Sequence, residues 1–231
     1  MRIWVTRTQP EAEATAGRLR ALGHAPLTAP VLKVGELSGE VDLKGVGALA
    51  FTSRNGVAAF AARHAERALP VFAVGAATAA AARGLGFGEV ASAEGDVTAL
   101  AALIAERHDR TRGQVLHPSA AEPAQDLAGA LTRLGVTARR QPLYETIPLP
   151  LAKAVAAALA AEPAEIDALL VHSPRAGRRL AELLEGRDEA RGLIALCISA
   201  AAAAPLAGLG LQEIRVAEFP NEASLLKLAD A

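Results

Sequence analysis

The sequence predicts an α/β protein made of two similar lobes, each built around a parallel sheet. Short apolar runs alternate along the chain with amphipathic segments of about ten to fifteen residues, as in strand–helix–strand folds. A unit of buried strand, polar loop and helix start also occurs twice. Residues 47–62 read GALAFTSRNGVAAFAA, and residues 168–184 read ALLVHSPRAGRRLAELL. In both copies a serine, Ser53 or Ser173, stands where it can cap the helix.

Further landmarks of the two halves follow in the same order. Leu22-Gly23 pairs with Leu134-Gly135, and Gly75 pairs with Ser199. Residues 95–98 (GDVT) resemble residues 221–224 (NEAS), and the separation grows only slowly from one pair to the next. A duplicated lobe with small loop insertions gives this pattern, and chance alignment of alanine-rich segments is the weaker explanation.

The first half is expected to open with a strand over residues 1–7 and a helix over residues 10–22, which a glycine ends. Residues 25–34 carry Pro26 and Pro30, so they suit an edge strand or a connector. The elements expected next are the repeated strand, a helix to about residue 67, a strand over 70–74, a helix over 76–83, a short strand near 89–91, a helix over 99–107 and a strand over 114–116.

The second half is expected to contain a helix over residues 124–134 and an extended segment over residues 137–147. A helix over 151–161, the second repeat, a strand over 193–198 with an alanine-rich helix, and a strand–loop–helix over 214–228 follow. Residues 193–211 carry no charge and have the length of a membrane span. Because this stretch is alanine-rich and contains a proline and two glycines, we expect a buried strand and a packed helix instead.

Composition limits the partners. The chain has 24 basic and 25 acidic residues and a net charge of −1, which argues against a nucleic-acid or membrane-surface protein. The single Cys197 excludes an internal disulfide, and residues 1–7 reach polar residues too early for a signal peptide, so a cytoplasmic protein is expected. His117 and His172 lack metal-ligand spacing, and structural roles are expected for them.

Six motifs carry a resemblance to a known family. They are VTR at residues 5–7, AFTSRNGV at 50–57, FAVGAAT at 72–78, PLYET at 142–146, HSPRA at 172–176 and PNEASL at 220–225. In this order, which spans nearly the whole chain, they make the sequence resemble the uroporphyrinogen-III synthases of tetrapyrrole biosynthesis.

The resemblance implies two α/β lobes joined by a two-stranded linker, with a cleft between them. Lobe 1 would be discontinuous, comprising residues 1–33 and 147–231, and lobe 2 would comprise residues 36–143. The linker strands would lie at about residues 25–34 and 137–147. Two tandem lobes would be the simpler division of a duplicated chain, and the family pattern is preferred here.

The resemblance also implies the activity. The substrate would be hydroxymethylbilane, a linear tetrapyrrole with many carboxylates, which the enzyme would cyclise to uroporphyrinogen III with loss of water and inversion of the last pyrrole ring. This reaction requires no redox step, so no cofactor and no metal are expected. We expect a monomer that binds neither nucleic acid nor membrane.

The candidate site residues follow from the resemblance and from their positions at strand ends, where open α/β sheets bind ligands. Ordinary helix capping is the alternative for any single loop, and surface solvation is the alternative for the arginines. Tyr144 is the expected proton donor to the departing hydroxyl, and Thr78 is a second catalytic candidate; packing at a lobe junction and simple capping are their alternatives. At the position equivalent to Thr78, the second repeat has Ala201 or Ala202 where the family commonly keeps a hydroxyl. The expected binding residues are Arg7, Thr52, Ser53, Asn55, Gly56, Gly75, Ala76, Ser119, Ser173, Pro174, Arg175, Ala176 and Ser199.

Two other functions are compatible with the same residues. A two-lobed binding or regulatory module for an anionic metabolite would use the same loops without chemistry. A sugar-phosphate isomerase is a weaker third possibility, because its hydroxyl-rich loop needs a carboxylate base that the sequence does not place.

Overall fold

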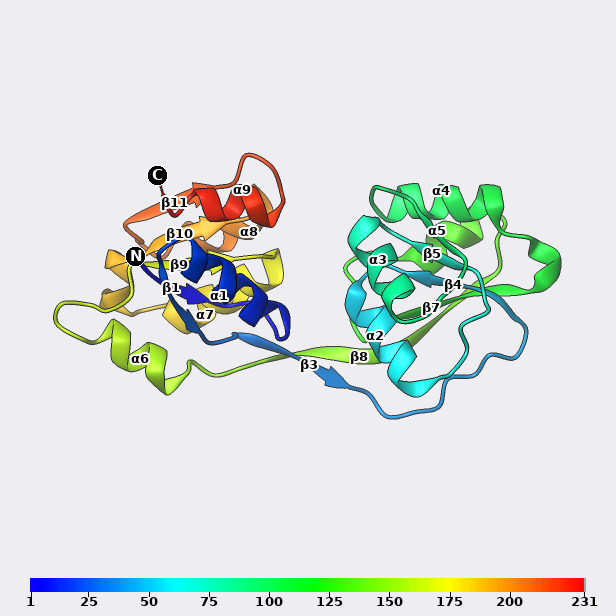
Figure 1. The fold of residues 1–231 in the computed structure, drawn as a ribbon, viewed down its shortest axis with the longest axis horizontal. Coiled ribbons are helices and arrows are strands. Elements are labelled where there is room, and N and C mark those ends of the chain that lie inside the picture. Colours follow the sequence, from blue (N-terminus) through cyan, green and yellow to red (C-terminus); the bar gives the residue numbers. More distant parts are fainter. Residues whose placement is uncertain (231) are drawn as a thin grey trace. The chain divides into compact units, whose positions relative to one another are not determined.

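The computed structural model describes residues 1–230 and divides into two compact units (Figure 1). Unit 1 contains Met1–Lys33 and the chain from Ile147 onward, and unit 2 contains Val34–Thr146. Each unit has one sheet in which parallel pairing dominates. The predicted α/β class is therefore confirmed.

The sheet of unit 1 has the strand order β11-β10-β9-β1-β2, and its neighbouring strands are parallel. Its strands are β1 (Arg2–Val5), β2 (Ala25–Thr28), β9 (Ala168–Val171), β10 (Ile194–Cys197) and β11 (Glu213–Val216). The central strand β9 is buried along its whole length, as its unbroken apolar sequence ALLV requires. Because β1 pairs with β9, the two ends of the chain build one sheet.

Helices cover both faces of this sheet. On one face, α1 (Glu11–Ala21) and α9 (Glu222–Lys227) pack Leu19 and Leu225 against Ile3 and Leu170. The opposite face buries Trp4 and Leu180. It is covered by α6 (Lys153–Leu159), α7 (Pro174–Leu184), α8 (Ala200–Ala203) and the short 3-10 helices η2 (Asp188–Gly192) and η3 (Ala204–Leu206).

The sheet of unit 2 has the order β3-β8-β7-β4-β5-β6. Its strands are β3 (Leu32–Glu36), β4 (Val46–Phe51), β5 (Val71–Ala73), β6 (Val90–Ser92), β7 (Gln114–Ala120) and β8 (Ala138–Pro148). The chain passes from one unit to the other twice, once within β3 and once within β8.

Helices also cover both faces of the second sheet. On one face, α2 (Arg54–Arg63) and α3 (Ala76–Gly84) enclose an aromatic cluster of Phe51, Phe60 and Phe87, with ring centroids 6.0 Å apart. On the other face, α4 (Val97–Arg107) and α5 (Leu127–Arg133) pack Leu100 and Leu127 into the core. The 3-10 helix η1 (Arg110–Arg112) leads into β7.

One strand is longer than expected. The strand expected over 114–116 extends to Ala120, because residues 117–119 continue to pair with β8 after pairing with β4 has ended at Leu116. Pro118 is tolerated there because the strand is paired on one side only. Ser119 consequently lies within β7, and the expected end of this strand at residue 116 was wrong.

Several helices are shorter than expected, since alanine-rich sequence does not mark helix ends. The helix expected over 124–134 begins only after the Asp126 cap, and the helix expected over 151–161 is limited to α6. The helix expected to reach residue 67 ends at Arg63, where His64 turns to extended backbone. The prediction of an extended segment over residues 25–34 is also refined. This segment forms two strands, β2 and β3, which are interrupted around Pro30, a residue without a backbone N–H.

The uncharged stretch 193–211 forms β10, α8 and η3, as the interpretation as a buried strand and a packed helix expected. In the described part of the chain, no helix combines the length and the apolar character that a bilayer crossing needs.

The glycines of α1 and α7 allow a direct test of close packing in unit 1. A Cβ on Gly177 would collide with the carbonyl oxygen of Ala202, whereas a Cβ on Gly17 would meet nothing within 4 Å. We expect Gly177→Ala to lower the free energy of unfolding by about 1–3 kcal/mol. Gly17→Ala should leave it unchanged or raise it by up to about 1 kcal/mol, because alanine favours a helix. Urea unfolding of both variants measures the difference, and equal effects would contradict the packing.

Candidate functional site

Ser53 links the central strand of unit 2 to the helix that follows it. The serine comes two residues after the end of β4, has extended backbone, and its Oγ accepts the Gly56 N–H at 3.1 Å. A glycine is needed at position 56, because a Cβ there would lie 2.9 Å from the Pro118 carbonyl oxygen. Helix α2 therefore starts directly against β7, with the amides of Arg54 and Asn55 at its N-terminus, where no preceding turn can accept them.

The Ser53 hydroxyl also contacts Tyr144. The two hydroxyl oxygens are 2.7 Å apart, and Tyr144, on β8, is 6% exposed. The structure thus brings together two of the predicted residues, which are 91 positions apart in sequence. Each hydroxyl is able to donate to the other.

Thr52 forms a second polar pair at the same turn. Its Oγ1 is 3.1 Å from His117 Nε2, and His117, on β7, is 1% exposed. Burial, together with the charge of Arg140, lowers the pKa of His117 to about 4, although Asp126 acts in the opposite direction. The ring is therefore neutral at pH 7.

The other predicted residues of unit 2 lie on the same edge of the sheet or just inside it. Gly75 precedes α3 with space for a Cβ and no side-chain cap, and Ala76 is the first residue of the helix. Thr78 is buried in the first turn of α3, and its amide donates to the Gly75 carbonyl. Ser119 is buried in β7, where its hydroxyl donates to the Ala120 carbonyl, so it caps no helix.

Unit 1 repeats the serine cap at its central strand. Ser173 follows β9, and its Oγ accepts the Ala176 N–H at 3.1 Å, the same distance as in the Ser53 cap. Pro174 is the first residue of α7 and has no N–H, so the first backbone N–H of this helix is that of Arg175. Ser199 caps the four-residue α8 through the Ala202 N–H at 3.3 Å.

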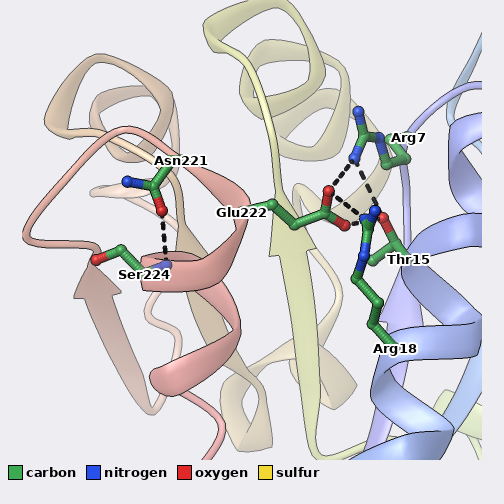
Figure 2. Close-up of polar contacts among 6 residues, drawn as sticks. All are labelled: Arg7, Thr15, Arg18, Asn221, Glu222 and Ser224. Atoms are coloured by element: carbon green, nitrogen blue, oxygen red, sulfur yellow. Dashed lines mark hydrogen bonds and ion pairs between the residues drawn. The ribbon is translucent and has the colours of Figure 1, made fainter.

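Arg7 lies at the same edge in a charged cluster (Figure 2). Its guanidinium is 3.3 Å from the Glu222 carboxylate and 3.1 Å from the Thr15 hydroxyl. Thr15 also donates to Glu222, and Arg18 pairs with the same carboxylate at 2.6 Å. One carboxylate at the start of α9 thus joins the end of β1 to two residues of α1.

The electrostatics of this cluster differ from those in unit 2. Burial alone would raise the pKa of Glu222, but the Thr15 hydrogen bond and the charges of Arg7 and Arg18 hold it below its ordinary value. Burial, with the Arg7 charge, lowers the pKa of nearby His172 to about 4 against the opposing effect of Glu222. Both ring nitrogens of His172 are buried without a hydrogen-bond partner among residues 1–230.

The described residues provide neither a reactive cysteine nor a set of metal ligands. Burial raises the pKa of the Cys197 thiol to about 12, so the thiolate nucleophile is absent at neutral pH. Within residues 1–230 no three His, Cys, Asp or Glu side chains are grouped so that they could hold a metal ion.

The decisive comparison covers almost the entire chain. Residues 13–227 match the family model described as uroporphyrinogen-III synthase HemD. The chain belongs to the uroporphyrinogen-III synthase family. The family and the enzyme class predicted from the motifs are confirmed: this synthase is a cyclising lyase of tetrapyrrole and haem biosynthesis.

Solved structures agree on the fold of the synthase. Uroporphyrinogen-III synthetase from Helicobacter pylori superposes with a TM-score of 0.68 at 18% identity, covering 99% of this chain and 97% of that one. A mutant uroporphyrinogen-III synthase from the extremely thermophilic bacterium Thermus thermophilus gives 0.56 at 19% identity, covering 99% and 96%. Curated proteins give no significant match.

The structure also shows residues of this synthase that the sequence analysis had not selected. His117 was expected to be only structural, yet it is hydrogen-bonded to the candidate residue Thr52. Glu222, Thr15 and Arg18 had no role, although they surround Arg7 (Figure 2). No sequence spacing indicates these contacts, because they join residues as much as 215 positions apart.

Glu222 should contribute stability that depends on pH. We expect Glu222→Gln to lower the free energy of unfolding by roughly 1–2 kcal/mol at pH 7, since it removes the charge that pairs with Arg7 and Arg18. The folded pKa of Glu222 lies below its ordinary value of 4.5. The contribution is therefore complete above the unfolded pKa, and it is lost as the pH falls through the folded one.

Chemical unfolding at several pH values measures this contribution. The matched control is Asp188→Asn, which removes an ion pair with Arg191 in which both side chains are at least 73% exposed. It should cost less than about 0.5 kcal/mol. A Glu222→Gln variant as stable as this control would contradict the assigned role.

Proposed function

We propose that this synthase cyclises hydroxymethylbilane by binding its carboxylates at the serine-capped helix starts that follow the central strands β4 and β9. The observation that carries the proposal is the matching geometry of Ser53 and Ser173, each of which accepts an N–H three residues on at 3.1 Å. A helix start in this position presents backbone N–H groups and the positive end of the helix dipole, which favour anionic groups.

The proposed binding site keeps all the predicted loop residues, but the residues contribute to binding in different ways. The amides of Gly56 and Ala176 are used by the caps, so their part is to allow close approach to the backbone. Thr52, Asn55 and Arg175 offer donors next to those caps, and Gly75 with Ala76 opens α3. Arg7 would act as a carboxylate partner with its charge shared by Glu222.

The chemistry is that of the family. Departure of the terminal hydroxyl gives a cationic azafulvene, attack at the substituted carbon of the last ring gives a spiro intermediate, and fragmentation with reclosure inverts that ring. Because no redox step occurs, positioning of the last ring should dominate the rate. Tyr144 would donate a proton to the departing hydroxyl.

Several broader expectations belong to the same proposal. We expect a monomer that acts in the cytoplasm and needs no nucleic acid, membrane or cofactor. We also expect one lobe of residues 1–33 and 147–231, a second lobe of residues 36–143, and the two linker strands and the cleft that the resemblance implies. The family match does not favour a binding module without chemistry.

Incubation of the purified protein with hydroxymethylbilane, followed by oxidation and separation of the uroporphyrin isomers, tests the activity. We expect the III isomer in excess over the spontaneous I isomer. Formation of the I isomer alone would contradict the proposal, and substrate binding with no III isomer would support the binding module.

Tyr144→Phe separates proton donation from packing. If the hydroxyl assists departure, kcat should fall by roughly a hundredfold or more. The lost contact with Ser53 should lower the free energy of unfolding by only about 1 kcal/mol. Steady-state kinetics and urea unfolding of the same preparation measure both effects.

Asp96→Ala is the matched control for Tyr144→Phe. It removes the cap that accepts the Ala99 N–H at 2.9 Å in the same unit, which costs about 1 kcal/mol. Its kcat should equal that of the wild type. Wild-type kcat in Tyr144→Phe would leave only a packing role for the tyrosine.

A further inference from the structure

We propose that His117 is a positioning residue that sets the direction of the Thr52 hydroxyl: the ring donates from Nε2 to Thr52 Oγ1, so that the threonine hydrogen is offered to a substrate carboxylate. This inference rests on the proposed function and assigns a part to a histidine that touches no substrate itself.

In the described residues, the His117 ring has one hydrogen-bond partner, the Thr52 hydroxyl. His117 lies on β7 and Thr52 immediately follows β4, the neighbouring strand, which places Nε2 3.1 Å from Oγ1. The other ring nitrogen, Nδ1, is buried and has no partner in the described residues. Any hydrogen on Nδ1 would therefore be an unsatisfied buried donor.

Three protonation states of the ring can be compared on this basis. An imidazolium would bury a charge beside the Arg140 guanidinium and leave an unpaired Nδ1–H, and the low pKa, about 4, agrees with its exclusion at pH 7. A neutral ring protonated on Nδ1 would still bury an unpaired N–H. A neutral ring protonated on Nε2 leaves only a lone pair unsatisfied, so it costs the least.

The selected tautomer decides what Thr52 can do. With Nε2–H donating, Oγ1 is the acceptor, and the threonine hydrogen has to turn away from the ring. The neighbouring Ser53 hydroxyl is engaged by the Gly56 N–H and by Tyr144. Thr52 thus supplies an outward O–H beside the N-terminus of α2, which suits an ionised carboxylate because that group only accepts hydrogen bonds.

Long-range ¹H–¹⁵N NMR of the labelled wild-type protein reads the tautomer directly. The chain has 5 histidines, and the His117 signals are assigned by their absence in His117→Phe. We expect the Nε2–H pattern at pH 7. An Nδ1–H pattern or a doubly protonated ring would overturn the inference, whether or not the protein is active.

Kinetics test the consequence for the substrate. His117→Phe and Thr52→Val should each raise KM about tenfold with little change in kcat. Thr52→Val removes the hydrogen bond to the carboxylate, and His117→Phe removes the ring that directs it. The double variant should show no further rise. His117→Gln and Thr52→Ser, which keep a donor and a hydroxyl, should restore most of the affinity.

His108→Phe is the matched control. His108 is also nearly buried in unit 2, and its Nε2 is 2.9 Å from the Gly113 carbonyl oxygen at the opposite end of β7. It should lower stability and leave KM unchanged. A wild-type KM in His117→Phe, or additive increases of KM in the double variant, would overturn the inference about His117. The proposed function would still stand if the protein formed the III isomer.

Discussion

A hydroxyl that accepts a backbone amide at the end of a buried central strand is the contact on which both units depend. Parallel strands deliver the chain to one edge of the sheet, and each following helix must begin there with amides that have no partner in a preceding turn. Ser53 and Ser173 satisfy one such amide each, through the same spacing and the same distance. Each cap thus fixes a helix start, with the positive end of its dipole, at the edge of its own sheet.

Close approach of the backbone follows from these caps. Gly56 lets α2 start against β7, and Gly177 lets α7 pack against the chain at Ala202. A side chain at position 56 would push α2 away from β7, and one at position 177 would push α7 away from α8, which contains Ala202. Small residues near the caps therefore allow the helix start to pack closely, in addition to leaving room for a ligand.

The two units use different chemistry around the same scaffold. In unit 2 the capped turn contacts the Tyr144 hydroxyl and the His117 ring, and burial keeps that ring uncharged at pH 7. At the corresponding edge, unit 1 has an ion cluster in which Glu222 shares its carboxylate between Arg7 and Arg18 (Figure 2). A protein with a net charge of −1 can thereby present local donors without an overall positive surface.

The sequence alone determined the α/β class, the order of strands and helices, the two serine caps and the family. The first three depend on periodicity and cap residues within short stretches, and the family depends on the order of short motifs along the chain. It did not determine that β7 continues through Pro118 or where the alanine-rich helices end, since both depend on pairing and packing with distant elements. Only the tertiary structure decided that Ser53 meets Tyr144, that Thr52 meets His117 and that Glu222 holds Arg7. These contacts join segments 65 to 215 positions apart, and they exist because parallel strands gather their ends at one edge, which no local pattern encodes.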